Sequence, residues 1–207
     1  MAPGEPFSQR RIGLTGGIAS GKSSVGRWLA QQGLPVLDAD QFAREALAPG
    51  HPATKSVMQR YGSTVRAEAT EAIDRAALGR IVFDDPAERR WLEHLIHPIV
   101  RKRFDQALSL YADTPAVVLM IPLLFEAGLE SLCSEIWLVD CDESQQLERL
   151  IARDGLSPKA AQARIAAQWP LNQKRGLADH VVANQGHPGA WQPQARELLK
   201  MSPTAEL

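Results

Sequence analysis

The sequence predicts an α/β fold in which a parallel sheet is flanked by helices in three layers, with an inserted helical domain and a lid. Two observations support this prediction. Short apolar segments alternate with helical segments along most of the chain, which is typical of parallel strands joined by crossover helices. Residues 53–112 hold helical patterns but no convincing strand, so they interrupt that order as an insertion. A chain of 207 residues can form one large α/β domain or a core with an inserted subdomain.

A glycine-rich loop follows the first predicted strand. Gly16 to Ser23 fits the phosphate-binding pattern G-x-x-x-x-G-K-[ST], between a short apolar strand and a helix over 23–32. Small residues leave backbone N–H groups open to a phosphate chain, and the helix start adds unpaired N–H groups and its positive dipole end. Lys22 is placed to reach the β- and γ-phosphates, and the Ser23 hydroxyl to ligate Mg²⁺. The alternative is a glycine-rich turn that matches the pattern by chance. Such chance matches usually lack the strand before the loop, the helix after it, or both.

By itself this motif indicates a sheet of the P-loop NTPase type that binds a nucleotide, with Mg²⁺ on the Ser23 hydroxyl. Within and after the loop, the expected ATP-binding residues are Gly17, Ile18, Ala19, Ser20, Gly21, Lys22, Ser23 and Ser24.

A second short strand, residues 35–38, ends in two acidic residues, Asp38 and Asp40. In an open parallel sheet, ligands lie beyond the carboxyl ends of the strands, so we expect both acids on the same edge as the P-loop. One can cap the following helix, and the other can orient and deprotonate a substrate hydroxyl. Arg44 follows about one helical turn beyond Asp40.

The helical block contains a basic cluster. We expect an N-cap at Asp74 for a helix over 75–83, and a helix over 87–97 after Pro86. Pro98 should end or kink that helix, and a second helix over 99–111 should follow. His97 and Arg101 then lie about one turn apart and could meet a phosphate-bearing substrate. A solvated basic face is an equally good interpretation.

The apolar run 116–121 is typical of a strand buried on both faces. It ends in Pro122 instead of an acid, and Pro122 to Glu126 forms a loop over the sheet edge. Direct carboxylate ligation of Mg²⁺ must therefore come from elsewhere or through water. Asp38 and Asp40 are the candidates, and Glu126 is a weaker one.

The second half of the chain predicts a strand at 135–140 and two helices, 144–153 and 158–168, broken at Asp154-Gly155. This break resembles a lid, whose arginines could neutralise charge on the transferred phosphoryl group. Arg149 and Arg153 are like charges one turn apart, which favours an anion between them. A final strand at 180–183 precedes a turn and a helix over 188–200 with Trp191 and Leu198 facing inward.

Bulk composition excludes several protein classes. The formal net charge of −1 provides no general field for nucleic acid or an anionic membrane. Two cysteines without metal spacing argue against a disulfide framework and fit a reducing compartment. No signal peptide and no apolar run long enough to span a membrane is found, so a cytoplasmic location is expected. Residues 1–9 should form a disordered lead-in.

From Arg11 to Gly186 the chain resembles the dephospho-CoA kinase family. The motifs that carry this resemblance are the segment 12–23, Asp38-Ala39-Asp40 with Ala43-Arg44, His97-Pro98, Pro122-Leu123-Leu124-Phe125-Glu126, and Ala178-Asp179 with Asn184-Gln185-Gly186. The resemblance implies transfer of the ATP γ-phosphoryl group to the ribose 3′-hydroxyl of dephospho-CoA, the last step of coenzyme A synthesis. It also implies a nucleotide-binding core (10–52 and 113–207), a helical CoA-side subdomain (53–112) and a lid (149–176).

By position, the resemblance implies roles for individual residues. The expected catalytic residues are Asp40 as the base, Lys22, Arg149 and Arg153, and Asn184 is expected to border the adenine. The expected substrate-binding residues are Asp40, Arg44, His97, Arg101, Leu124 and Phe125. The expected partner is the small-molecule substrate dephospho-CoA, and binding to nucleic acid or to a membrane is not expected. The protein is expected to be a monomer or a weak homo-oligomer.

Two positions depart from the family pattern, which usually has Gly in place of Ala19 and often Thr in place of Ser24. A Cβ at position 19 is harmless if φ is negative and costly if φ is positive. Neither change removes a chemical group, so we expect activity to be retained. The alternatives are another P-loop small-molecule or nucleoside monophosphate kinase, a GTPase-like switch and a non-catalytic homologue. The lack of an N-K-x-D motif argues against a GTPase-like switch. The intact Lys22, Ser23 and Asp40 argue against a non-catalytic homologue.

Overall fold

The computed structural model describes residues 9–67 and 70–201 and divides the chain into two compact units. One unit comprises Met1–Leu37 and Tyr111–Leu207, and the other comprises Asp38–Leu110. The predicted boundary after residue 52 therefore lies inside the second unit, because the helix that follows Asp38 packs against the long helix of that unit. Phe42 and Phe104 make this contact edge to face, with ring centroids 5.0 Å apart. The predicted lead-in falls on residues 1–8, which lie outside the described residues, and on Gln9.

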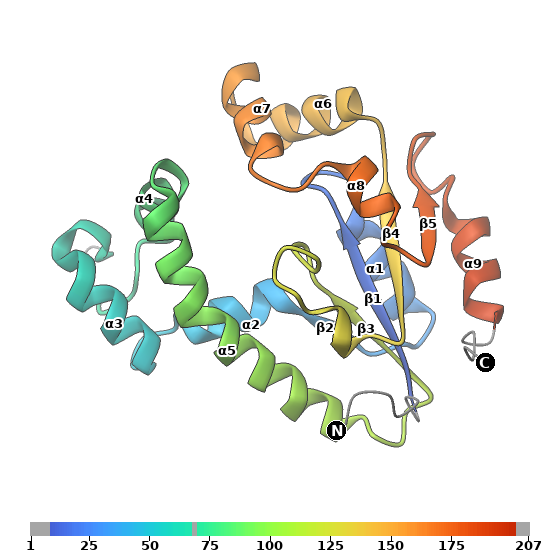
Figure 1. Cartoon of the computed structure of the whole chain (residues 1–207), viewed down its shortest axis with the longest axis horizontal. Helices are drawn as coiled ribbons and strands as arrows, with labels where there is room; N and C mark the ends of the chain where they lie inside the picture. Colours follow the sequence, from blue (N-terminus) through green and yellow to red (C-terminus); the bar gives the residue numbers. More distant parts are fainter. Residues whose placement is uncertain (1–8, 68–69, 202–207) are drawn as a thin grey trace. The chain divides into compact units, whose positions relative to one another are not determined.

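The first unit is built on a parallel sheet whose strand order is β2-β3-β1-β4-β5 (Figure 1). Its strands are β1 (Arg10–Gly16), β2 (Val36–Asp38), β3 (Ala116–Met120), β4 (Glu135–Asp140) and β5 (His180–Ala183). Its helices are α1 (Lys22–Gln31), α6 (Glu143–Asp154), α7 (Pro158–Ala166), α8 (Leu171–Arg175) and α9 (Gln192–Lys200). The strand β1 pairs in parallel with both β3 and β4, so the loop after it lies at the middle of the sheet edge.

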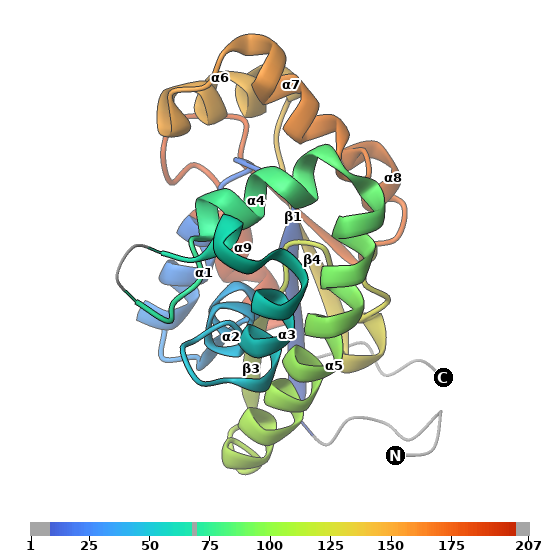
Figure 2. The same ribbon diagram turned by 90° about the vertical axis from the view of Figure 1, so that its left-hand side faces the viewer.

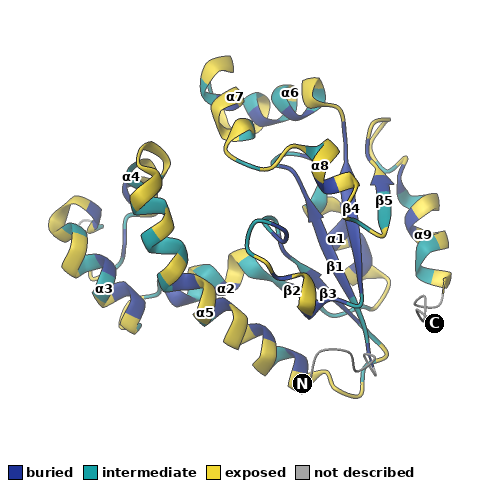
Figure 3. Ribbon diagram, viewed as in Figure 1, coloured by how far each residue is buried: buried dark blue, intermediate teal, exposed yellow. Residues whose placement is uncertain are grey.

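Burial explains why these segments form central strands. Figure 3 shows β1, β3 and β4 buried, and every residue of β4 is buried. On one face, Ile12 and Leu14 of β1 pack with Trp28 of α1 and Trp191, which precedes α9. On the other, Gly13 lies so close to Leu124 and Cys133 that a Cβ would lie 2.9 Å from a Leu124 methyl carbon. The segment after β3 thus covers the middle of the sheet directly.

Several local expectations at the chain's turns are confirmed. Asp74 caps α4 through Ala76 and Ala77, and Ser157 caps α7 with Pro158 at its first position. Gly155 ends α6 in the left-handed conformation, with φ 65°.

The predicted disordered lead-in differs at its last residue. Gln9 is buried, and its side chain donates to the carbonyl of Thr114 at 2.9 Å, so it does not belong to a disordered lead-in.

The helical unit contains α2 (Ala39–Ala46), α3 (Pro52–Tyr61), a 3₁₀ turn at Gly62–Val65, α4 (Arg75–Asp84) and α5 (Pro86–Leu110). Figure 2 faces this unit and shows α3 and α4 beside α5. Their shared core is formed by Val57, Val65, Ile73 and Leu78, with Trp91 of α5 packed against it. Tyr61 and Arg60 of α3 both bond to Glu88 of α5, at 2.5 and 2.6 Å.

Two predicted helix boundaries are wrong. α5 continues through Pro98 as one helix. Proline removes one backbone donor, but Ile96, Val100, Phe104 and Leu108 keep a buried stripe at four-residue spacing on both sides of it. The last helix begins at Gln192 instead of residue 188, because Gly189 adopts φ 85°, which a right-handed helix cannot contain.

The short helix α8 has no counterpart in the sequence prediction. It follows Pro170, and Figure 1 shows it with α6 and α7 at the carboxyl ends of β1 and β4. Among the described residues, none of the helices combines the length and apolar character that crossing a bilayer requires.

Candidate active site

The phosphate-binding loop has the predicted strand–loop–helix geometry. β1 ends at Gly16, and α1 begins at Lys22. A Cβ at Gly16 would lie 2.7 Å from the carbonyl oxygen of Val139, so only glycine fits there. Gly21 precedes α1 with φ 98°, and a Cβ there would collide with the side-chain amide of Asn184. The glycines are therefore required by close packing and by backbone conformation, and the N–H groups at the start of α1 form an anion-binding terminus.

Ala19 is the one non-glycine residue with a positive φ, 59°, in the described part of the chain. Of the two cases considered for the missing glycine, the structure selects the costly one. L-residues adopt this left-handed conformation at a cost of roughly 1–2 kcal/mol. The loop therefore holds local strain at the residue that departs from the family pattern.

Asn184 ties the last strand of the sheet to this loop. It is 8% exposed, and its Nδ2 donates to the Ser20 carbonyl at 2.8 Å. Its backbone N–H donates to the carbonyl of Asp140 at 2.7 Å, and its own carbonyl accepts from Arg149 Nη2 at 3.0 Å. The side chain predicted to border adenine thus also supports the phosphate-binding loop.

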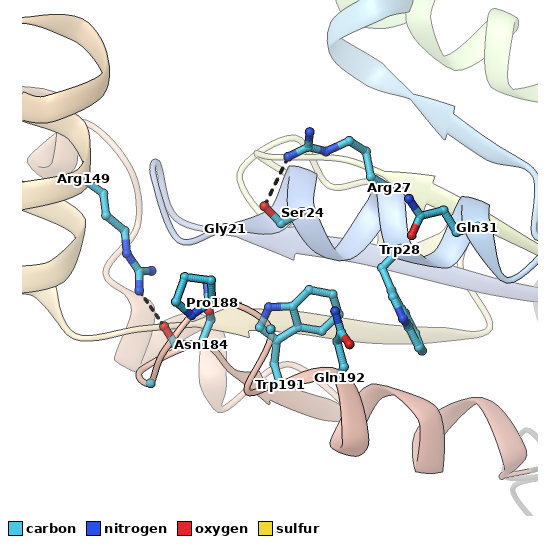
Figure 4. Close-up of a pocket in the computed structure, with 12 residues that line it drawn as sticks. Gly21, Ser24, Arg27, Trp28, Gln31, Arg149, Asn184, Pro188, Trp191 and Gln192 are labelled. Atoms are coloured by element: carbon cyan, nitrogen blue, oxygen red, sulfur yellow. Dashed lines mark hydrogen bonds between the residues drawn. The ribbon is translucent and has the colours of Figure 1, made fainter.

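A cavity of about 530 Å³ opens beside Asn184 (Figure 4). This volume lies within the usual range for small-molecule sites. The cavity is lined by one face of α1, by Arg149 of α6 and by the turn before α9: Gly21, Ser24, Arg27, Trp28, Gln31, Arg149, Asn184, Gly186, Pro188, Gly189, Trp191 and Gln192. Arg149 Nη1 is buried, and no hydrogen-bond acceptor for it exists among the described residues. A planar cation with a spare donor at the cavity wall is suited to a polar aromatic ligand.

Arg149 and Arg153 do not share one partner. Arg153 is paired with its neighbour Asp154 at 2.7 Å, and Arg164 of α7 contacts the same carboxylate at 3.2 Å. The hydrogen bond from Arg153, with further charge from both arginines, lowers the pKa of Asp154. The expected anion between Arg149 and Arg153 is therefore not required, since Asp154 provides the negative charge beside Arg153.

In the helical unit, the structure separates the two acids of the second motif. Asp38 is the N-cap of α2, and its Oδ1 accepts from the backbone N–H of Asp40 at 2.9 Å. Asp40 is exposed in the first turn of α2, and Arg44 is exposed one turn later. The capping function thus belongs to Asp38 and not to Asp40.

The remaining predicted substrate residues fall into two kinds. His97 and Arg101 are both exposed on the continuous helix α5, one turn apart. Leu124 and Phe125 are buried at 0% and 4% exposure and pack in the first unit. Within this structure the two apolar residues support the loop after β3 instead of lining an open surface.

Glu126 is engaged by the segment that follows α7. Its Oε1 lies 2.7 Å from Nζ of the fully buried Lys174 and accepts from the Trp169 N–H at 3.1 Å. The Lys174 ammonium and the Glu126 carboxylate lie within ion-pair distance, but their angles do not satisfy the geometry of a hydrogen bond. Glu126 Oε2 is buried without a hydrogen-bond partner in the described residues. Nothing in the sequence pointed to Lys174, because a lysine in a polar segment is normally solvated.

The residues present fit a magnesium ion that is carried largely by phosphate oxygens. Ser23 offers an exposed hydroxyl at the start of α1. The described residues form no group of three or more His, Cys, Asp or Glu side chains able to hold a metal by themselves. Mg²⁺ in nucleotide sites usually takes one or two protein oxygens, phosphate oxygens and waters, so a single hydroxyl in the loop is a sufficient anchor.

Comparison with known proteins assigns the family. A model described as dephospho-CoA kinase matches residues 10–188. A dephospho-CoA kinase of Synechococcus sp. (strain CC9605) is 98% identical over 207 residues and 100% of each chain. A solved structure from Thermus thermophilus has a TM-score of 0.80 at 35% identity and covers 93% of this chain and 97% of that one.

A solved dephospho-CoA kinase from Campylobacter jejuni has a TM-score of 0.68 at 27% identity, covering 91% of this chain and 94% of its own. These matches confirm the expected P-loop kinase architecture of a parallel sheet flanked by helices. They leave the roles of single residues to the geometry. The chain belongs to the dephospho-CoA kinase family.

Proposed function

We propose that this protein transfers the γ-phosphoryl group of ATP to the ribose 3′-hydroxyl of dephospho-CoA, giving coenzyme A and ADP. The observation that carries the proposal is the full-length match to the dephospho-CoA kinase family, in a chain whose P-loop keeps every polar group the chemistry needs. Catalysis of this type consists mainly of positioning and charge stabilisation, which a preformed loop can supply.

The nucleotide is proposed to bind across the loop and the adjoining cavity. N–H groups between Gly17 and Ser24 hold the β- and γ-phosphates, and Lys22 neutralises them. Ser23 anchors Mg²⁺, which when bound offsets phosphate charge during the transfer. Adenine then occupies the cavity beside Asn184, against the guanidinium of Arg149. The support for this placement is the unsatisfied buried Nη1 of Arg149 at the cavity wall.

The acceptor is proposed to bind through the helical unit, as its CoA-side subdomain. Asp40 orients the 3′-hydroxyl and accepts its proton, and Arg44, His97 and Arg101 contact the substrate. In support, all four side chains are exposed, and Asp38 already satisfies the helix cap. Leu124 and Phe125 stay in the proposal only as buried packing for the loop after β3 in the first unit.

Residues 149–176 are proposed to act as the lid that excludes water during transfer, with Arg149 and Arg153 as its cations. For Arg153, this role requires its guanidinium to release the carboxylate of Asp154 and to bind a phosphate group instead. We further propose a cytoplasmic protein that acts on a small molecule as a monomer or weak homo-oligomer.

The test measures ADP release from ATP–Mg²⁺ with dephospho-CoA, AMP or a nucleoside as acceptor. We expect strong stimulation by dephospho-CoA alone. Stimulation by AMP or the nucleoside instead would favour the alternative, another P-loop small-molecule or nucleoside monophosphate kinase.

The base is tested with Asp40→Asn, which should bind ATP normally and lose at least about 100-fold in kcat, the lower range for general base catalysis. The control is Asp105→Asn, the same change at an exposed site on α5 of the same unit. Near-normal kcat in Asp40→Asn would show that Asp40 is not the base.

A further inference from the structure

Two glutamine side chains hold a single residue of the phosphate-binding loop by both of its backbone polar groups. Gln146 Nε2 donates to the carbonyl oxygen of Ile18 at 2.8 Å. Gln168 Oε1 accepts from the N–H of the same Ile18, also at 2.8 Å. Both distances are those of good hydrogen bonds. The two glutamines are far from the loop in sequence and lie outside the motifs on which the family resemblance was based.

Gln146 reaches the loop from α6. It is 4% exposed and shares the buried face of that helix with Leu150. It also lies against Gly17, where a Cβ would collide with its Nε2. A buried polar residue on an otherwise apolar stripe needs a hydrogen-bond partner, and Ile18 is that partner.

Gln168 reaches the loop from the segment after α7, and this segment is itself fixed. The next residue, Trp169, donates its N–H to Glu126, which pairs with the buried Lys174 of α8. Leu171 at the start of α8 lies near Gly17, with a methyl carbon 3.4 Å from the position of a Cβ there. Gln168 therefore approaches Ile18 from an anchored support.

We propose that Gln146 and Gln168 are positioning residues for ATP binding, which hold the loop at Ile18 in its phosphate-binding conformation. A loop with three glycines and a strained Ala19 has many accessible conformations, and ordering it on binding would cost affinity. Two hydrogen bonds to the residue beside Ala19 restrict the loop before ATP arrives. The inference rests on the proposed function only for the identity of the nucleotide.

The test replaces each glutamine by methionine, which has similar length, no hydrogen-bond donor to replace Gln146 Nε2, and only a weakly accepting sulfur in place of Gln168 Oε1. Gln32→Met is the matched control, because Gln32 is exposed at the end of α1, lies outside the proposed lid, and its side chain makes no hydrogen bond with the described residues. ATP–Mg²⁺ and ADP affinities are measured by calorimetry, with thermal unfolding measured in parallel. We expect Gln146→Met and Gln168→Met to raise the ATP Kd by about fivefold to tenfold, within the range for one lost hydrogen bond, and to leave the KM for dephospho-CoA unchanged. The control should bind ATP as the unaltered protein does.

If either variant binds ATP within twofold of the unaltered protein, the proposal is overturned, even if that variant is less stable. If Gln146→Met does not fold, Gln168→Met decides the question, because its side chain is less buried. The affinity readout does not depend on transfer. Absence of phosphorylation of dephospho-CoA by the unaltered protein would therefore refute the proposed function and leave this test intact.

Discussion

Replacing Ala19 by glycine should stabilise this protein, although it removes a methyl group. Ala19 holds φ at 59°. An L-residue in this conformation costs roughly 1–2 kcal/mol, which glycine avoids. Against this gain, glycine makes the unfolded chain more flexible, which costs roughly 0.4–1 kcal/mol. The expected net change is a gain of about 0.8 kcal/mol in the free energy of unfolding, the middle of a range from about 0 to 1.6 kcal/mol.

The assay is urea unfolding of the nucleotide-free protein, supported by thermal unfolding. For a chain of this size, 1 kcal/mol corresponds to roughly 2–4 °C in Tm, so the expected rise is about 1–4 °C. The control is Ala163→Gly in the middle of α7, at an exposed helical position, where the same substitution should lower stability by about 1 kcal/mol. Equal destabilisation by both substitutions would refute the reasoning, because it would show that Ala19 carries no conformational strain.

Two further predictions concern buried and charged pairs. Lys174→Met should lower the free energy of unfolding by about 3–5 kcal/mol, because it leaves Glu126 without its cation, and Glu126→Met in addition should restore most of that loss. Urea unfolding of the single and double variants measures this, and a double variant no more stable than Lys174→Met would contradict it. In the helical unit, the hydrogen bond from Arg60, with one from Tyr61, lowers the pKa of Glu88 from 4.5 to about 2. Since the folded-state pKa is the lower one, this stabilisation is complete above pH 4.5 and disappears as the pH falls toward about 2. Glu88→Gln should flatten the fall of unfolding free energy across that window, and an unchanged acid profile would rule the pair out as its cause.

Local patterns predicted much of the fold and part of the site. The strand–loop–helix at Gly16 to Ser23, the cap at Asp74 and the Ser157-Pro158 helix start all depend on contacts within a few residues, and all are present in the structure. Pro98 shows the limit of such rules. Its missing hydrogen bond is outweighed by a buried apolar stripe on both sides, which only the packed unit creates.

The partners of the charged residues were not predictable in the same way. Arg153 was expected to bind an anion together with Arg149. In the structure, Arg153 pairs with the carboxylate of the neighbouring Asp154 instead. Lys174 carried no sequence signal at all, because its burial depends on Glu126, which is separated from it along the chain by one strand, β4, and two α-helices, α6 and α7.

The sequence by itself determined the P-loop, the parallel α/β architecture and the family, because these depend on residue types at fixed short spacings. Only the tertiary structure decided that Asp38 is the cap, that Ala19 is strained and that Gln146 and Gln168 hold Ile18. These facts depend on backbone conformation and on contacts between residues far apart in the chain. Spacing along the sequence contains no information about which distant group completes a hydrogen bond or fills a buried position.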